Sequence, residues 1–134
     1  MTQAISNYMG ATGIGVSDLK RSMDFYMNVF GLKKIWKLKL PQMHEIILNF
    51  EGEQKASVVL MHYVDGSNPN YKNNPVKLVF YVTDPKACIE KIRGEGLEIV
   101  REATPVPELR NAVVGLAKDP DGYLLEILQS AAPL

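Results

Sequence analysis

Hydrophobic and polar residues alternate over several short stretches of the chain, as in β-strands that have one covered face. The clearest stretch is 35–40, where Trp36, Leu38 and Leu40 are expected to point inward and the two intervening lysines into solvent. Lysines on such a strand also suit the edge of a sheet. Further strands of the first half are predicted at 10–17, 44–50 and 56–63.

Two other stretches carry apolar residues at helical spacing. The first is predicted to begin after Asp18, which can cap a helix, and to end at Gly31. Its covered face consists of Leu19, Met23, Tyr26 and Phe30. The second helix is predicted to start at Asp84-Pro85, a cap followed by a proline in the first turn. Its covered face consists of Cys88, Ile89 and Ile92.

The two halves of the chain correspond to each other at an offset of 66 or 67 residues. Each half reads as strand, helix and three more strands, with a loop expected at 104–107 and a tight turn at 119–122. The pattern predicts an α+β fold in which a single domain over 1–134 contains two βαβββ modules. Their predicted extents are about 8–64 and about 76–130, joined by a linker at about 65–75.

Charge and composition narrow the range of partners. Fifteen Lys and Arg balance fifteen Asp and Glu, so the formal net charge is zero. Nucleic-acid grooves and anionic membrane surfaces require a basic excess, and we therefore expect a small-molecule ligand and neither of those partners. The single cysteine, Cys88, excludes a disulfide framework. Residues 1–7 have no signal-peptide pattern and no apolar run is long enough for a membrane span, so a cytoplasmic protein is expected.

Two motifs resemble the vicinal oxygen chelate superfamily, which includes glyoxalase I, extradiol dioxygenases, and fosfomycin- and bleomycin-resistance proteins. The first motif covers 16–26 with Phe30-Gly31-Leu32, and the second covers 119–127, beginning Asp119-Pro120-Asp121-Gly122. The resemblance implies two βαβββ modules that form a curled mixed sheet around a cavity. It also implies a homodimer, because members of this family commonly complete the cavity with a second copy.

Most catalytic members of the family bind a divalent metal through four strand positions, and the resemblance places these on Ala11, Val59, Lys77 and Glu126. Alanine and valine have no donor atom, and a charged lysine cannot ligate. We therefore predict no metal and no cofactor. In glyoxalase I an arginine and an asparagine also help to hold glutathione, and the matching positions here are Gly15 and Tyr63.

Strand alternation from the four ligand-equivalent positions predicts which side chains line the cavity. The ligand-binding candidates are Trp36, Ser57, Met61, Tyr63, Tyr81 and Arg110, with Val79, Leu124 and Leu128 beside them. Such a lining is largely apolar and aromatic with a few polar groups, as in sites for small organic ligands. The alternative interpretation is that the apolar members fill a core.

Lys77 and Glu126 are the predicted catalytic residues. Opposite charges that converge on one buried point are expected to pair. Lys77 would stabilise an oxyanion or enolate, and Glu126 would act as the base. The first interpretation is therefore a metal-independent lyase or isomerase acting on a small carbonyl or aromatic compound. Two alternatives stay open: an ion pair that only fills the former metal position, and a non-catalytic binding protein similar to bleomycin-resistance proteins. A metal-dependent lactoylglutathione lyase or dioxygenase fits these positions less well.

Overall fold

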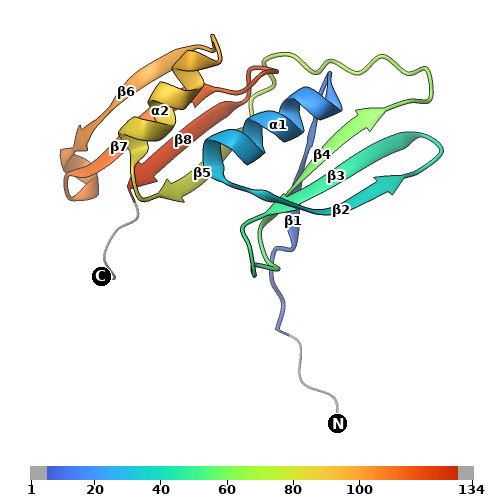
Figure 1. Cartoon of the computed structure of the whole chain (residues 1–134), viewed down its shortest axis with the longest axis horizontal. Helices are drawn as coiled ribbons and strands as arrows, with labels where there is room; N and C mark the ends of the chain where they lie inside the picture. The colour runs from blue at the N-terminus through green and yellow to red at the C-terminus, as the bar shows by residue number, and fades with distance from the viewer. Residues whose placement is uncertain (1–5, 130–134) are drawn as a thin grey trace.

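Two four-stranded sheets and two helices make up the fold in the computed structural model, which describes residues 6–129 (Figure 1). The elements before the linker are β1 (Ala11–Gly15), α1 (Leu19–Phe30), β2 (Lys33–Lys39), β3 (Met43–Asn49) and β4 (Ser57–Tyr63). Those after it are β5 (Lys77–Val82), α2 (Pro85–Gly94), β6 (Ile99–Val106), the 3-10 turn η1 (Pro107–Leu109), β7 (Ala112–Lys118) and β8 (Leu124–Gln129). The predicted α+β class and order of elements are confirmed. Residues 1–5, part of the segment in which we found no signal-peptide pattern, and residue 130 of the predicted second module lie outside the described residues.

The two sheets have the same topology, as the repeat in the sequence predicts. Their strand orders are β1-β4-β3-β2 and β5-β8-β7-β6. In each sheet the first strand pairs in parallel with the last, and the other pairs are antiparallel. The helices α1 and α2 cover one face of the sheets and lie next to each other, which leaves the opposite faces open (Figure 1). Neither helix within residues 6–129 is long and apolar enough to span a bilayer.

The first helix forms for the reasons that its sequence indicates. Asp18 caps it by accepting a hydrogen bond from the Arg21 backbone, and Gly31 ends it at a φ of 76°. Tyr26 and Phe30 are buried, while Leu19 and Met23 are partly buried against the core. At its end the ring of Phe30 stacks on that of Phe80 of β5, with 4.0 Å between ring centroids. This stack joins the helix of the first module to a strand of the second.

Strand β2 differs from the prediction in which of its residues are covered. Trp36, expected to point inward, is 61 % exposed, and Leu38 and Leu40 are only half-buried. Trp36 pairs with Ile47 on the open face, whereas the neighbouring Ile46 and Leu48 point toward the helix and are buried. Alternation shows which residues share a face but not which face a helix covers. The inward assignment of Trp36 is therefore wrong.

The prediction of a loop at 104–107 is also wrong in part. Strand β6 continues through Thr104 and Pro105 to Val106, and only then does the 3-10 turn begin. Pro105 has no backbone N–H to donate, but β6 is the outer strand of its sheet, where a missing donor is tolerated. The pairing register with β7 also shifts between Arg101 and Thr104.

The turn at 119–122 forms as predicted, but its two aspartates are buried rather than exposed turn residues, each only 2 % exposed. Asp121 accepts hydrogen bonds from the backbone N–H and the hydroxyl of Ser17, at 3.0 and 2.5 Å. Asp119 accepts one from the hydroxyl of Tyr26 at 2.6 Å and two from backbone N–H groups of its own turn. The turn of the second module is thus bonded directly to the first.

The burial of Asp119 makes stability depend on pH. Desolvation raises the pKa of this carboxyl above its ordinary value of 3.8, although the hydrogen bond from Tyr26 acts in the opposite direction. Between 3.8 and the raised value, the folded chain keeps a proton that the unfolded chain has lost, so this contribution to stability falls as pH rises. The free energy of unfolding of the wild type minus that of Asp119→Asn should decrease over this interval in urea titrations. A flat or rising difference would contradict the assignment.

Candidate functional site

An ion pair joins the first and last strands of the second sheet on its open face. Parallel pairing places Val79 beside Glu126, and Lys77 lies two residues earlier on the same side of β5. Its Nζ atom is 3.0 Å from Glu126 Oε1. The Lys77 side chain is 48 % exposed and that of Glu126 is 21 % exposed. The pair is therefore partly solvated, not buried as we expected, because no helix covers this face.

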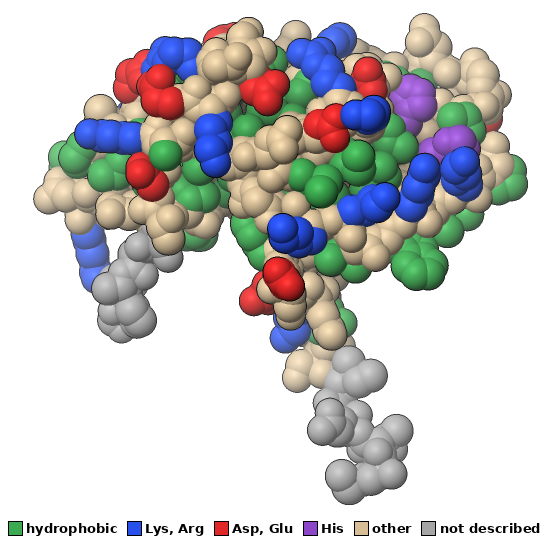
Figure 2. Space-filling model, in the orientation of Figure 1, with side chains coloured by type: hydrophobic (Ala, Val, Ile, Leu, Met, Phe, Trp, Pro, Cys, Tyr) green, Lys and Arg blue, Asp and Glu red, His purple; other side chains and the backbone are tan. Residues whose placement is uncertain are grey.

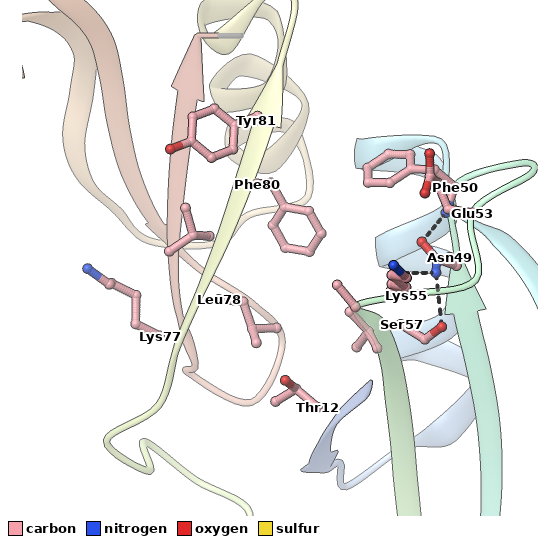
Figure 3. A pocket seen from close by; sticks show the side chains of 13 residues that line it. Thr12, Asn49, Phe50, Glu53, Lys55, Ser57, Lys77, Leu78, Phe80 and Tyr81 are labelled. Atoms are coloured by element: carbon pink, nitrogen blue, oxygen red, sulfur yellow. Dashed lines mark hydrogen bonds between the residues drawn. The ribbon is translucent and has the colours of Figure 1, made fainter. Parts of the chain in front are cut away.

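Strand β5 directs its side chains to two different places. Leu78 and Phe80 are buried on the side facing the first module, whereas Lys77 and Tyr81 point to the other side (Figure 3). Tyr81 is 64 % exposed. The polar side chains of Lys77 and Tyr81 thus lie on the open face.

A groove of about 700 Å³ separates β5 from the first module (Figure 3). On its far wall the Asn49 side-chain amide donates hydrogen bonds to the Lys55 carbonyl and to the Ser57 hydroxyl, each at 2.9 Å. Both Asn49 and Ser57 are buried. Ser57, a predicted ligand-binding residue, is thus engaged in the wall of the groove, opposite the strand that carries Lys77.

A second cavity, of about 560 Å³, includes Glu126. Its lining belongs to the second module alone: Tyr81, Glu108, Leu109, Arg110, Asn111, Ala112, Glu126, Leu128 and Gln129. The predicted residues Tyr81 and Arg110 thus share a cavity with Glu126. Lys77, which pairs with Glu126, instead lines the groove of about 700 Å³, together with Ser57 and Tyr81. Sequence reasoning missed five of the lining residues: Glu108, Leu109, Asn111, Ala112 and Gln129. Their position within two residues of a predicted lining residue in the chain was the only available signal.

The remaining predicted residues lie on the open face of the first sheet. Trp36, Met61 and Tyr63 belong to β2 and β4, and none of them lines the cavity of Glu126. Glu45 of β3 pairs with Met61 and therefore lies on the same face. Sequence reasoning did not select Glu45, although its alternation with Ile47 could have identified it.

The linker places Tyr71 where the resemblance puts the glutathione-binding positions. A Cβ atom added to Gly15 would lie 3.1 Å from the Tyr71 ring, so a longer side chain at position 15 would displace this ring. The Tyr71 hydroxyl accepts a hydrogen bond from the Tyr63 backbone N–H at 3.1 Å. Its ring also stacks on His62, whose Nδ1 is 2.8 Å from the Val16 carbonyl. Tyr71 thus contacts both positions.

The donor set does not fit the divalent metal that the resemblance implies. Of the four positions, Ala11 and Val59 have no donor atom, and the ammonium of Lys77 already contacts the carboxylate of Glu126. Among residues 6–129, no group of three or more His, Cys, Asp and Glu side chains is arranged to hold a metal ion. The mechanism proposed below therefore uses only the side chains of this chain.

The comparisons of this chain with known proteins agree on one family. The chain is 31 % identical to a lactoylglutathione lyase of Neisseria meningitidis over 122 residues, 88 % of this chain and 87 % of the relative. The crystal structure of glyoxalase I from Zea mays superposes with a TM-score of 0.74 at 27 % identity. The match covers 93 % of this chain but only 45 % of the maize chain. TnmS3, an antibiotic binding protein from Streptomyces sp. CB03234, shares the fold with a TM-score of 0.71 at 19 % identity.

Residues 8–127 match the model of one protein family, and this range includes nearly all of both modules and the Lys77–Glu126 pair. The chain belongs to the Glyoxalase/Bleomycin resistance protein/Dioxygenase superfamily.

Proposed function

We propose that this protein is a metal-independent enzyme of the lyase or isomerase type that removes a proton next to the carbonyl group of a small compound. The observation that supports this proposal most directly is the contact between Glu126, which lines a cavity of the second module, and Lys77, which lines the groove beside β5. A carboxylate can act as a general base, and an ammonium group 3.0 Å away can stabilise the negative charge that develops on a nearby oxygen.

The proposed step transfers one proton. Glu126 takes the proton from the carbon next to the carbonyl group, and the electrons of the broken C–H bond form a C=C bond. The carbonyl π electrons move to oxygen, and Lys77 stabilises the resulting enolate. In an isomerase reaction the enolate then receives the proton back from Glu126 at the same or a neighbouring carbon. In a lyase reaction the electrons on the enolate oxygen re-form the carbonyl group, a C=C bond forms between the deprotonated carbon and the next carbon, and a leaving group on that next carbon departs with its bonding electrons.

The position of Tyr71 supports a substrate other than a glutathione adduct. Its ring lies against Gly15 and its hydroxyl is bonded to the backbone of Tyr63, the two positions that match the glutathione-binding residues. Because these positions hold a glycine and a tyrosine, neither offers the arginine or asparagine side chain of glyoxalase I.

Identity to the Neisseria lyase favours a second candidate, a lactoylglutathione lyase. This candidate requires that the chain convert the adduct of methylglyoxal and glutathione. Production of the thioester from this adduct, lost in EDTA and restored by a divalent metal, would favour it over the metal-independent proposal.

Hydrogen–deuterium exchange tests the proposed proton transfer directly, whichever product the full reaction forms. In D₂O containing EDTA, the protein should catalyse the loss of the α-proton NMR signals of one or more 2-oxo acids or diketones. Glu126→Gln should lower the exchange rate by about 10²–10⁴-fold, because the base is removed. Lys77→Met should lower it by about 10²–10³-fold, because the enolate loses its cation.

The matched control is Lys33→Met, which removes an exposed lysine from β2 and should leave the exchange rate unchanged. If none of the compounds exchanges but some of them bind, the protein is a non-catalytic binder, and the proposed function is wrong.

The exposure of the ion pair predicts that both variants fold. Because Lys77 is 48 % exposed, breaking the pair should cost less than about 1 kcal/mol, not the roughly 3–5 kcal/mol typical of a buried pair. The free energies of unfolding of Lys77→Met and Glu126→Gln, measured in urea, should therefore differ little from that of the wild type. A loss of several kcal/mol would contradict this prediction and show that the pair is desolvated in solution.

We also propose a homodimer, because both sheets leave apolar side chains uncovered. Trp36, Val79 and Tyr81 are exposed by 61, 44 and 64 %. Burying such side chains against a second copy would be favourable, and it would bring Trp36, Met61 and Tyr63 of one copy toward the cavity of the other.

Light scattering should give about twice 15.0 kDa for the wild type. Trp36→Glu should shift the protein to the monomer, because the charge would be buried in the interface. Val64→Asp is the matched control, since Val64 is 43 % exposed but follows β4 in a loop outside both sheets. A wild type that stays monomeric at its highest soluble concentration would contradict the proposal.

A further inference from the structure

The turn between β6 and β7 holds two successive residues in a backbone conformation that side chains disfavour. Arg110 has φ 57° and ψ 36°, and Asn111 has φ 61°. Asparagine tolerates this left-handed region better than most residues, whereas arginine has no such preference for it. The backbone N–H groups of both residues donate within the turn, to the carbonyls of Pro107 and Val106. The turn is thus well held, but glycine would adopt the same conformation without strain.

The strained residues line the cavity that contains Glu126. Tyr81, Leu109 and Leu128 supply apolar surface to the same cavity. The charge of Glu126 is balanced by Lys77 at 3.0 Å. Within residues 6–129, by contrast, no carboxylate oxygen lies within 4.0 Å of a nitrogen of the Arg110 side chain. The lining of the cavity therefore includes a carboxylate paired with a cation and, among the described residues, a guanidinium group without an ion-pair partner.

We propose that the left-handed pair 110–111 presents Arg110 to the cavity so that it binds the carboxylate of the substrate. The substrate class is then a small 2-oxo acid or a related carbonyl compound that carries a carboxylate. A guanidinium group can donate two parallel hydrogen bonds to a carboxylate, which fixes the orientation of the ligand as well as its position. The acidic C–H bond would then face Glu126. This inference rests on the proposed proton-transfer function for the identity of the reacting group.

Glu108 lines the same cavity and provides an internal comparison. It lies in the same turn two residues before Arg110, so it carries the opposite charge at a similar place. If Arg110 binds a carboxylate, removal of the Glu108 charge should leave the affinity for an anion unchanged or increase it.

Two probes that differ in one group test the proposal: 2-oxobutyrate and the uncharged 2,3-pentanedione, in which an acetyl group replaces the carboxylate. Their dissociation constants are measured by NMR titration of the full chain, together with the thermal midpoint. Arg110→Gly should raise the dissociation constant of 2-oxobutyrate by about ten- to hundredfold, because a charge-assisted contact is lost. It should leave the dissociation constant of 2,3-pentanedione within about twofold of the wild-type value and should not lower the thermal midpoint of unfolding.

Asn73→Gly is the matched variant, because Asn73 also has a positive φ, of 52°, and lies in the linker outside the cavity of Glu126. It should leave both dissociation constants within about twofold, and Glu108→Gln should not weaken 2-oxobutyrate. An equal rise in the dissociation constants of both probes in Arg110→Gly would overturn the proposal. So would failure of the wild type to bind 2-oxobutyrate and its homologues from pyruvate to 2-oxohexanoate.

The same samples separate this inference from the proposed function. Exchange of α-protons that depends on Glu126 but not on Arg110 would contradict the carboxylate site alone. Binding of 2-oxobutyrate that depends on Arg110, without any exchange, would leave the carboxylate site in place and contradict the enzymatic role.

Discussion

Asp119 and Asp121 are buried carboxylates of the second module that accept hydrogen bonds from the first, through Tyr26 and Ser17. A buried carboxylate is costly unless it is well bonded, so these contacts favour one placement of the two modules over others. The hydroxyl of Tyr123, from the same segment, donates to the Gly15 carbonyl and adds a further hydrogen bond between the modules. With the modules in this placement, α1 and α2 lie next to each other and both open faces remain free for ligands or a second copy (Figure 1).

The consequence of this arrangement is visible on the surface. The Phe30–Phe80 stack fills the space between the modules on the helix side, whereas the side chains of the open faces have no such partner. Figure 2 shows the view from the helix side, with charged side chains of both signs spread over the surface and a row of Lys and Arg toward one end. The two charged residues of the proposed chemistry, Lys77 and Glu126, both lie on the open face of the second sheet, away from the helices. Strand register positions each of them there.

The repeat in the sequence was sufficient to predict the order of the elements, because alternation and spacing determine strand pairing within one module. The proximity of Lys77 to Glu126 was instead implied by the family resemblance, which placed both residues at ligand-equivalent positions. The wrong assignment of Trp36 has a different origin, because the choice of the covered face depends on where a helix packs. The burial of Asp119 and Asp121 was missed for the same reason: their partners Tyr26 and Ser17 are about 90 to 100 residues away in the chain. Likewise, the left-handed conformation of Arg110 arises from a turn whose sequence contains no glycine.

The partial exposure of the Lys77–Glu126 pair bears on its role. A solvated ion pair adds little to stability, so this contact does not hold the fold together in the way that the buried aspartates do. The same exposure leaves both groups accessible to a ligand. During proton transfer Glu126 would become neutral as an enolate oxygen becomes negative, so Lys77 would exchange one anionic partner for another without ever facing the cavity unpaired. In a weak, open pair this exchange costs less than in a buried one, where each charge depends on the other for its solvation.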